Sequence, residues 1–134
     1  MRKITEIIIH CSFTKSTQDF RAVDIRKWHI QDNGWSDIGY NDVICRDGLI
    51  ESGRPHEIPG AHAKNHNSNS IGICLVGGMD KEGKPIFNFT QAQMLALIAY
   101  VNGLKKKYPK AKVIGHNQVS TKDCPCFNVE AFFS

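Results

Sequence analysis

Apolar residues in this chain occur in short runs that are separated by polar segments rich in glycine, asparagine and proline. The runs have the length of strands, and the first of them, Ile4 to His10, has the β-branched composition of a buried strand. Together they predict strands at residues 4–10, 40–45, 49–52, 70–76 and 112–115. Arg46-Asp47-Gly48 separates two of these runs and predicts a hairpin turn.

Two further segments have the spacing of helices. The first covers about residues 21–32, and Gly34 follows its last turn. Thr90 opens the second helix, because Thr90 and Gln93 form a capping-box pattern, and the apolar spacing continues to about residue 107. The expected apolar positions are Val23, Ile25, Trp28 and Ile30 in the first helix, and Met94, Leu95, Leu97, Ile98, Val101 and Leu104 in the second.

Strands and helices are mixed along the chain without a regular alternation. This order predicts an α/β fold of the mixed α+β kind, with a single mixed β-sheet flanked by helices. Residues 54–69 form a long polar loop without periodicity, and such a loop in a small domain is usually functional. We expect residues 1–134 to form one domain. The apolar residues expected to fold back onto the body after the last strand are Phe127, Val129, Phe132 and Phe133.

Composition narrows the function classes. Hydrophobic residues make up 41% and charged residues 22% of the 134 residues, which is typical of a folded globular protein. The net charge of +4 is only mildly basic, and the densest basic cluster, Lys105–Lys107, ends a predicted helix, where cations favour the helix dipole. We therefore expect no nucleic-acid partner. We expect no membrane partner either, since no apolar run approaches the roughly 20 residues that cross a bilayer.

The chain has five cysteines at irregular spacing, and this odd number does not indicate a disulfide framework. The N-terminus lacks the pattern of a signal peptide, so we expect the cysteines to be reduced. Cys45 and Cys74 lie within apolar runs and are expected to be buried as small hydrophobic residues.

Histidines end two predicted strands, at His10 and His116, and Cys124 lies in the loop after the second. Imidazole nitrogen and thiolate sulfur suit Zn²⁺ better than Mg²⁺ or Ca²⁺. If the two strands are neighbours, these side chains converge and leave the fourth tetrahedral position for water, as in a catalytic zinc site. Two alternatives stay open. Each histidine could be an ordinary hydrogen-bonding residue, and Cys126 could complete a closed, structural His₂Cys₂ site.

Four ordered sequence blocks run nearly end to end along the chain. They are Ile8-Ile9-His10-Cys11-Ser12; Trp35-Ser36-Asp37-Ile38-Gly39-Tyr40-Asn41; Gly60-Ala61-His62-Ala63 with His66-Asn67 and Ser70-Ile71-Gly72-Ile73; and Gly115-His116-Asn117 with Lys122-Asp123-Cys124-Pro125. In these blocks the chain resembles the type 2 N-acetylmuramoyl-L-alanine amidases, the family that includes phage T7 lysozyme and the peptidoglycan recognition proteins.

The resemblance implies roles for individual residues. The ligands that it implies for a Zn²⁺ cofactor are His10, His116 and Cys124. It implies that Tyr40 and Lys122 act beside the metal and that His62 lines the substrate groove. Trp35 could contact a sugar of the substrate or pack within the protein, and we expect His66 to be an exposed loop residue.

The activity implied is zinc-dependent hydrolysis of the amide bond between the muramoyl lactyl group and L-alanine in peptidoglycan. Lys122 could stabilise the tetrahedral oxyanion, and Tyr40 could donate a hydrogen bond to it. The implied partner is peptidoglycan or a muropeptide, bound by a monomer that is made in the cytoplasm and acts on the cell wall after release or non-classical export. A non-catalytic peptidoglycan-binding or regulatory protein of the same fold is the alternative.

Overall fold

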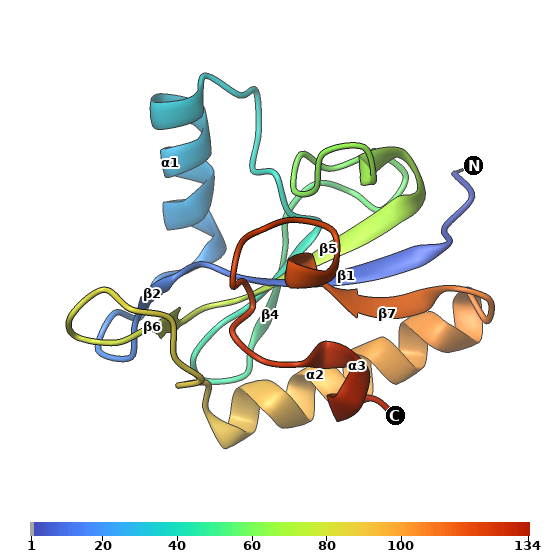
Figure 1. Ribbon diagram of the computed structural model, residues 1–134. Helices are drawn as coiled ribbons and strands as arrows, with labels where there is room; N and C mark the ends of the chain where they lie inside the picture. The colour runs from blue at the N-terminus through green and yellow to red at the C-terminus, as the bar shows by residue number, and fades with distance from the viewer. Residues whose placement is uncertain (1) are drawn as a thin grey trace.

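The computed structural model describes residues 2–134 and has the mixed α+β architecture that the sequence predicts. Its centre is a five-stranded sheet with the strand order β4-β3-β5-β1-β7 (Figure 1). These strands are β1 (Glu6–Cys11), β3 (Asp42–Ile44), β4 (Ile50–Ser52), β5 (Ser70–Leu75) and β7 (Lys112–Gly115). β1 pairs in parallel with both β5 and β7, β3 pairs in parallel with β5, and β4 runs antiparallel to β3.

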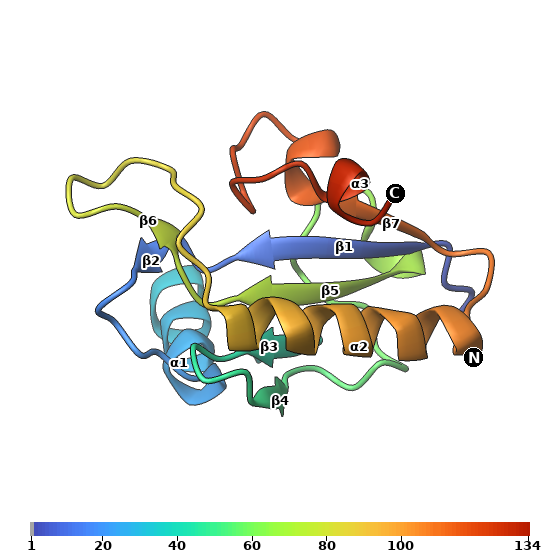
Figure 2. The same ribbon diagram turned by 90° about the horizontal axis from the view of Figure 1, so that it is seen from below.

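Helices cover both faces of this sheet. They are α1 (Ala22–Asn33), α2 (Gln91–Lys107) and the short α3 (Val129–Phe132), with 3₁₀ turns at Asn67–Asn69 and His116–Gln118. Figure 2 shows α2 lying along one face, whereas α1 packs against the other. A small parallel sheet of β2 (Thr14–Lys15) and β6 (Gly78–Met79) extends beyond the carboxyl ends of β1 and β5, and the sequence pattern did not predict it.

Side-chain alternation in β1 decides which face of the sheet carries its polar residue. Ile7 and Ile9 pack in the core beneath α2, so Ile8 and His10 point to the opposite face. That face packs against α1 through Ile25. His10 is only 1% exposed. Its buried imidazole therefore lies on the same face as the core that includes Ile25 of α1.

Both predicted helices form, and their end signals are confirmed. Gly34 adopts the left-handed conformation after α1 (φ 69°). Thr90 and Gln93 cap α2 reciprocally: each backbone N–H donates to the other side chain, at 2.9 and 3.0 Å. The predicted apolar faces are partly wrong, since Val23 is 70% and Leu95 59% exposed. The stripe of α2 that is buried against the sheet is narrower and consists of Gln93, Leu97, Val101 and Leu104.

The C-terminal segment folds back over β7, as the sequence predicts. Val129 is fully buried, and Phe127 and Phe133 pack against the same core. Phe132 remains exposed, with its ring edge-on to Phe127. The prediction that Cys45 and Cys74 are buried is confirmed as well. Among residues 2–134, no helix is both long and apolar enough to cross a membrane.

Gln93 is a fully buried polar residue between α2 and the sheet. Its Nε2 donates to the carbonyl oxygens of Ile44 at 3.1 Å and Val76 at 2.9 Å. Its Oε1 accepts the N–H of Thr90 at 2.9 Å. One side chain therefore joins the first turn of α2 to the ends of β3 and β5.

We expect Gln93→Leu to lower the free energy of unfolding by about 2–4 kcal/mol, because two carbonyls and one N–H lose their buried partners. Gln91→Leu is the matched control at an exposed position of the same helical turn, and it should change that free energy by less than about 0.5 kcal/mol. Urea denaturation of the three proteins measures both values. Equal effects at the two positions would contradict the role assigned to Gln93.

Candidate metal centre and active-site cleft

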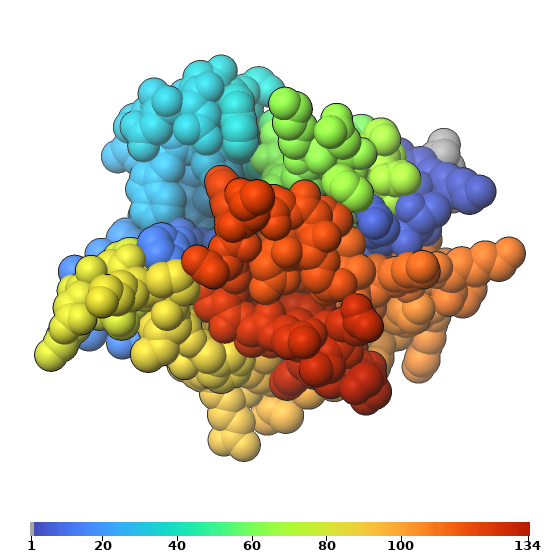
Figure 3. Space-filling model, in the orientation of Figure 1, coloured from blue at the N-terminus to red at the C-terminus, as the bar shows by residue number. Residues whose placement is uncertain are grey.

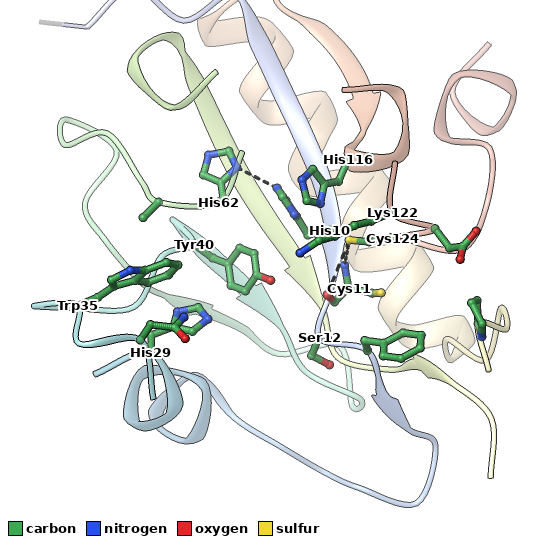
Figure 4. Close-up of a pocket in the computed structure, with 15 residues that line it drawn as sticks. His10, Cys11, Ser12, His29, Trp35, Tyr40, His62, His116, Lys122 and Cys124 are labelled. Carbon is green, nitrogen blue, oxygen red and sulfur yellow. Dashed lines mark hydrogen bonds between the residues drawn. The ribbon is translucent and has the colours of Figure 1, made fainter. Parts of the chain in front are cut away.

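The structure brings His10, His116 and Cys124 together beyond the middle of the sheet (Figure 4). One candidate ligand atom from each side chain lies within 4.8 Å of the others. His10 lies in β1 and His116 follows β7 directly, and these strands pair with Ile9 opposite Gly115. The strand adjacency on which the sequence argument depended is therefore present.

The donor atoms of this group fit a borderline-soft metal ion such as Zn²⁺. Burial lowers the pKa of His10 well below its usual value, and the neighbouring His62, His116 and Lys122 lower it further. Burial also lowers the pKa of His116, again with a contribution from Lys122. Both imidazoles are therefore neutral at pH 7, with a lone pair available to a cation. Two imidazoles and one sulfur match the donors of a three-ligand zinc site.

Cys124 reaches the group from the loop that follows β7. Its Sγ accepts the backbone N–H of Cys11 at 3.1 Å. β1 therefore carries the candidate ligand His10 and also donates a hydrogen bond to the candidate ligand Cys124. Figure 4 draws this contact beside His10. The thiolate is the form in which a cysteine binds a metal ion.

Cys126 lies outside the group. Its Sγ donates to the carbonyl oxygen of Gly78 at 3.2 Å and lies 4.0 Å from Cys11 Sγ. Burial raises the pKa of Cys126 to about 12, so it remains a thiol. Cys126 has a φ of 71°, so the backbone is not extended at this residue and its side chain does not follow that of Cys124 towards the group. Within residues 2–134, no closed His₂Cys₂ site forms at this place.

Tyr40 and Lys122 both border the candidate metal group. The Tyr40 and His10 ring centroids are 5.1 Å apart. Burial raises the pKa of Tyr40 well above its usual value, so its hydroxyl keeps its proton at pH 7. Lys122 is exposed and lies in the loop between β7 and Cys124. A hydrogen-bond donor and a cation therefore line the same space beside the group.

That space is a cleft of about 500 Å³. Figure 3 shows the segments around it on one face of the molecule: α1, the loop before β5 in green, and the segment from β7 to α3 in orange and red. Trp35 and His29 lie at one end of the cleft, beyond Tyr40 (Figure 4). The ligand group, Tyr40, Lys122, His62 and Trp35 thus share one cavity.

Trp35 packs within the protein, and its side chain also lines the cleft. Its ring centroid lies 4.7 Å from that of His29, and a Cβ on Gly39 would come within 2.7 Å of the Trp35 ring. His29, for which the sequence offers no role, accepts the N–H of Gly39 on its Nδ1 at 2.8 Å. No sequence pattern marks His29 as a cleft residue. The helix that carries it is only weakly amphipathic, so its spacing does not show which residues face the cleft.

Phe13 is a second cleft residue that sequence reasoning missed. It is 41% exposed and adopts a φ of 55°, a conformation that is unusual for a bulky residue. The preceding Ser12 holds this turn, since its Oγ accepts the N–H of Gly77 at 2.9 Å and bonds to Thr14 Oγ1 at 2.7 Å. An aromatic side chain at the edge of the cleft results from this backbone, and no motif in the sequence predicts it.

His62 contacts the candidate metal group itself. Its Nδ1 lies 2.8 Å from His10 Nε2, and its Nε2 lies 3.2 Å from Ser70 Oγ. Burial lowers the pKa of His62 to about 3, and the neighbouring His116 contributes. The prediction that His66 is an exposed loop residue is wrong, because the loop lies against the start of β1 and His66 bonds to Glu6 Oε1 at 2.8 Å.

Buried polar contacts fasten the long loop that carries His62. Asn41 is fully buried, donates to the carbonyl oxygen of Ile58 at 3.3 Å and accepts the N–H of Gly72 at 2.9 Å. His56 bonds to the buried Asp42 at 2.6 Å. The loop is therefore a rigid wall of the cleft in spite of its irregular backbone.

We expect the metal-free protein to lose stability as the pH falls from about 7 to about 5. His10, His62 and His116 have lowered pKa values in the folded state. Below their ordinary pKa of about 6.5, the unfolded chain therefore binds more protons than the folded chain. Denaturation in the presence of a chelator measures the effect above the range in which carboxyl groups titrate. A free energy of unfolding that is constant or rises over this range would contradict it.

Comparison with known proteins agrees with this geometry. Residues 1–127 match the family model of N-acetylmuramoyl-L-alanine amidase. The endolysin of Escherichia phage T7 is 45% identical over 127 residues, which are 95% of this chain and 83% of the endolysin. The N-acetylmuramoyl-L-alanine amidase LysC from Clostridium intestinale has a TM-score of 0.82 at 30% identity, over 98% of this chain and 83% of that one. A variant of Drosophila PGRP-LB in complex with tracheal cytotoxin has a TM-score of 0.80 at 30% identity, over 100% and 82%. This chain therefore belongs to the N-acetylmuramoyl-L-alanine amidase family of enzymes.

Proposed function

We propose that this protein is a zinc-dependent amidase that hydrolyses the bond between the muramoyl lactyl group and L-alanine in peptidoglycan. The observation that carries the proposal is the convergence of His10, His116 and Cys124 at the floor of a cleft. The family match and the amidase LysC support the reaction. The similarity to PGRP-LB, whose solved complex contains tracheal cytotoxin, supports a substrate of the peptidoglycan type.

His10, His116 and Cys124 are the residues that would hold Zn²⁺. When bound there, the ion supplies a Lewis acid and lowers the pKa of a water molecule. Three protein ligands are the number that leaves a position open for water in catalytic zinc sites. Because Cys126 is bonded to Gly78, it does not compete for that position.

Lys122 and Tyr40 would act on the charge that develops during amide hydrolysis. The carbonyl oxygen of the substrate becomes an oxyanion in the tetrahedral intermediate, and a nearby ammonium group stabilises it. Lys122 lines the cleft and is exposed, so its side chain can reach a bound amide. Tyr40 is half-buried and lines the cleft, and its hydroxyl keeps its proton and can donate a hydrogen bond to the same oxygen.

Trp35 is the residue that we propose for contact with a sugar ring. Its ring packs against His29 and Gly39 and also lines the cleft. An aromatic ring held in this way offers an apolar surface at little cost in conformational entropy. We also infer that the protein works as a monomer of one domain and acts on the cell wall after release or export.

Substitution of Cys124 separates a catalytic metal from the other interpretations. Wild type should bind about one Zn²⁺ per chain and release new N-terminal alanine from purified peptidoglycan. Cys124→Ser should lose both properties, whereas the matched Cys126→Ser should keep both, because its sulfur contacts Gly78 instead of the ligand group. Metal analysis and an assay for free N-terminal alanine measure these outcomes. Binding to peptidoglycan without alanine release by the zinc-loaded protein would exclude the amidase.

We expect Lys122→Ala and Tyr40→Phe each to lower kcat by roughly 10²–10³-fold while the zinc content stays unchanged, because each removes charge stabilisation from the transition state. Lys64→Ala is the matched control at an exposed lysine of the loop that forms one wall, and its kcat should equal that of wild type. Initial rates of alanine release and metal content are measured on the same samples. Full activity of Lys122→Ala would remove that lysine from the mechanism.

A further inference from the structure

The contact between His62 and His10 occupies one specific nitrogen of a candidate metal ligand. The bond joins His10 Nε2 to His62 Nδ1 at 2.8 Å, with the two rings nearly perpendicular at 89°. A nitrogen that shares a proton in a hydrogen bond has no lone pair left for a metal. His10 Nδ1 is then the atom that remains for the ion.

This arrangement determines where the hydrogens lie. If His10 Nδ1 is to bind a cation, its Nε2 must carry the hydrogen and donate to His62 Nδ1. His62 must then carry its own hydrogen on Nε2, where Ser70 Oγ lies at 3.2 Å as the acceptor. Ser70 is fully buried, so this acceptor is shielded from water. The three side chains form a directed chain of hydrogen bonds that starts at the candidate ligand.

The His62 ring is held in place from two sides. Asn67 Oδ1 accepts the backbone N–H of both His62 and Ala63, each at 2.9 Å. The ring also lies close above Gly72 of β5, since a Cβ at that position would come within 2.5 Å of the imidazole. The absence of a side chain at Gly72 therefore makes room for His62 to reach His10.

We propose that His62 is a positioning residue for the metal centre, which orients the His10 imidazole and selects its metal-binding tautomer. The inference rests on the proposed zinc site and differs from the groove-lining role that the family resemblance implies. It also explains why His62, Asn67, Ser70 and Gly72 occur together in one sequence block: they build the support for a ligand that lies 52 residues earlier in the chain. Partners of this kind typically change metal affinity by about 10–100-fold when they are removed.

The test compares His62→Leu, which has no acceptor, with His62→Asn, whose side-chain oxygen can take the place of Nδ1. Zinc affinity is measured by competition with a chromophoric chelator, and the absorption spectrum of the Co²⁺-substituted protein reports the ligand geometry. We expect about 10–100-fold weaker zinc binding and an altered cobalt spectrum for His62→Leu, with partial recovery in His62→Asn. The control, His66→Leu, changes a histidine of the same loop that bonds to Glu6, and it should keep the wild-type affinity and spectrum.

Ser70→Ala provides a second variant in case His62→Leu does not fold. It removes the last acceptor without touching His10, and we expect a smaller loss of zinc affinity. Unchanged zinc affinity and cobalt spectrum in folded His62→Leu, with only a higher KM for peptidoglycan, would overturn the inference and make His62 a substrate contact. If wild type itself binds no zinc, the proposed function fails first, and the role of His62 fails with it.

Discussion

The parallel pairing of β1 with β5 on one side and β7 on the other is the constraint on which the site depends. In the pairing with β5, His10 lies opposite Cys74. In the pairing with β7, Gly115 lies opposite Ile9, so His116 follows beside β1. Because successive side chains of a strand alternate between faces, a slip of one residue in β1 would send His10 into the core beneath α2. The isoleucines of β1 therefore set the position of the candidate ligand as well as the stability of the sheet.

Two of the three candidate ligands are imidazoles that remain neutral at pH 7, so their lone pairs are free to bind a cation. The imidazoles of His10, His62 and His116 lie close together, and burial suppresses the protonation of each. Lys122 adds a positive charge that the substrate can reach from the open side. In the proposed mechanism, an environment that keeps lone pairs free for a metal would also stabilise an anionic intermediate.

Local signals in the sequence predicted the parts of the fold that are determined locally. The Thr90–Gln93 capping box and Gly34 at the end of α1 are recognisable because each acts within one turn of chain. The candidate ligands could be named because few residue types bind zinc, and because the sequence blocks resemble a known family.

The errors concern contacts between residues that are distant in sequence. The direction of Cys126 follows from a left-handed backbone, and the pairing of His66 with Glu6 depends on how the loop lies against β1. The bond between His62 and His10 joins two sequence blocks, and the role assigned to each block did not require a contact with the other. Each of these features requires the assembled tertiary structure.

The candidate ligands lie at opposite ends of the chain, at residues 10, 116 and 124. During synthesis, the segment that contains His10 leaves the ribosome long before the other two. A polypeptide that stops before residue 116 contains only one of the three candidate ligands. The candidate metal centre can therefore form only after both segments have been synthesised, because a polypeptide that stops before residue 124 lacks one of its three ligands.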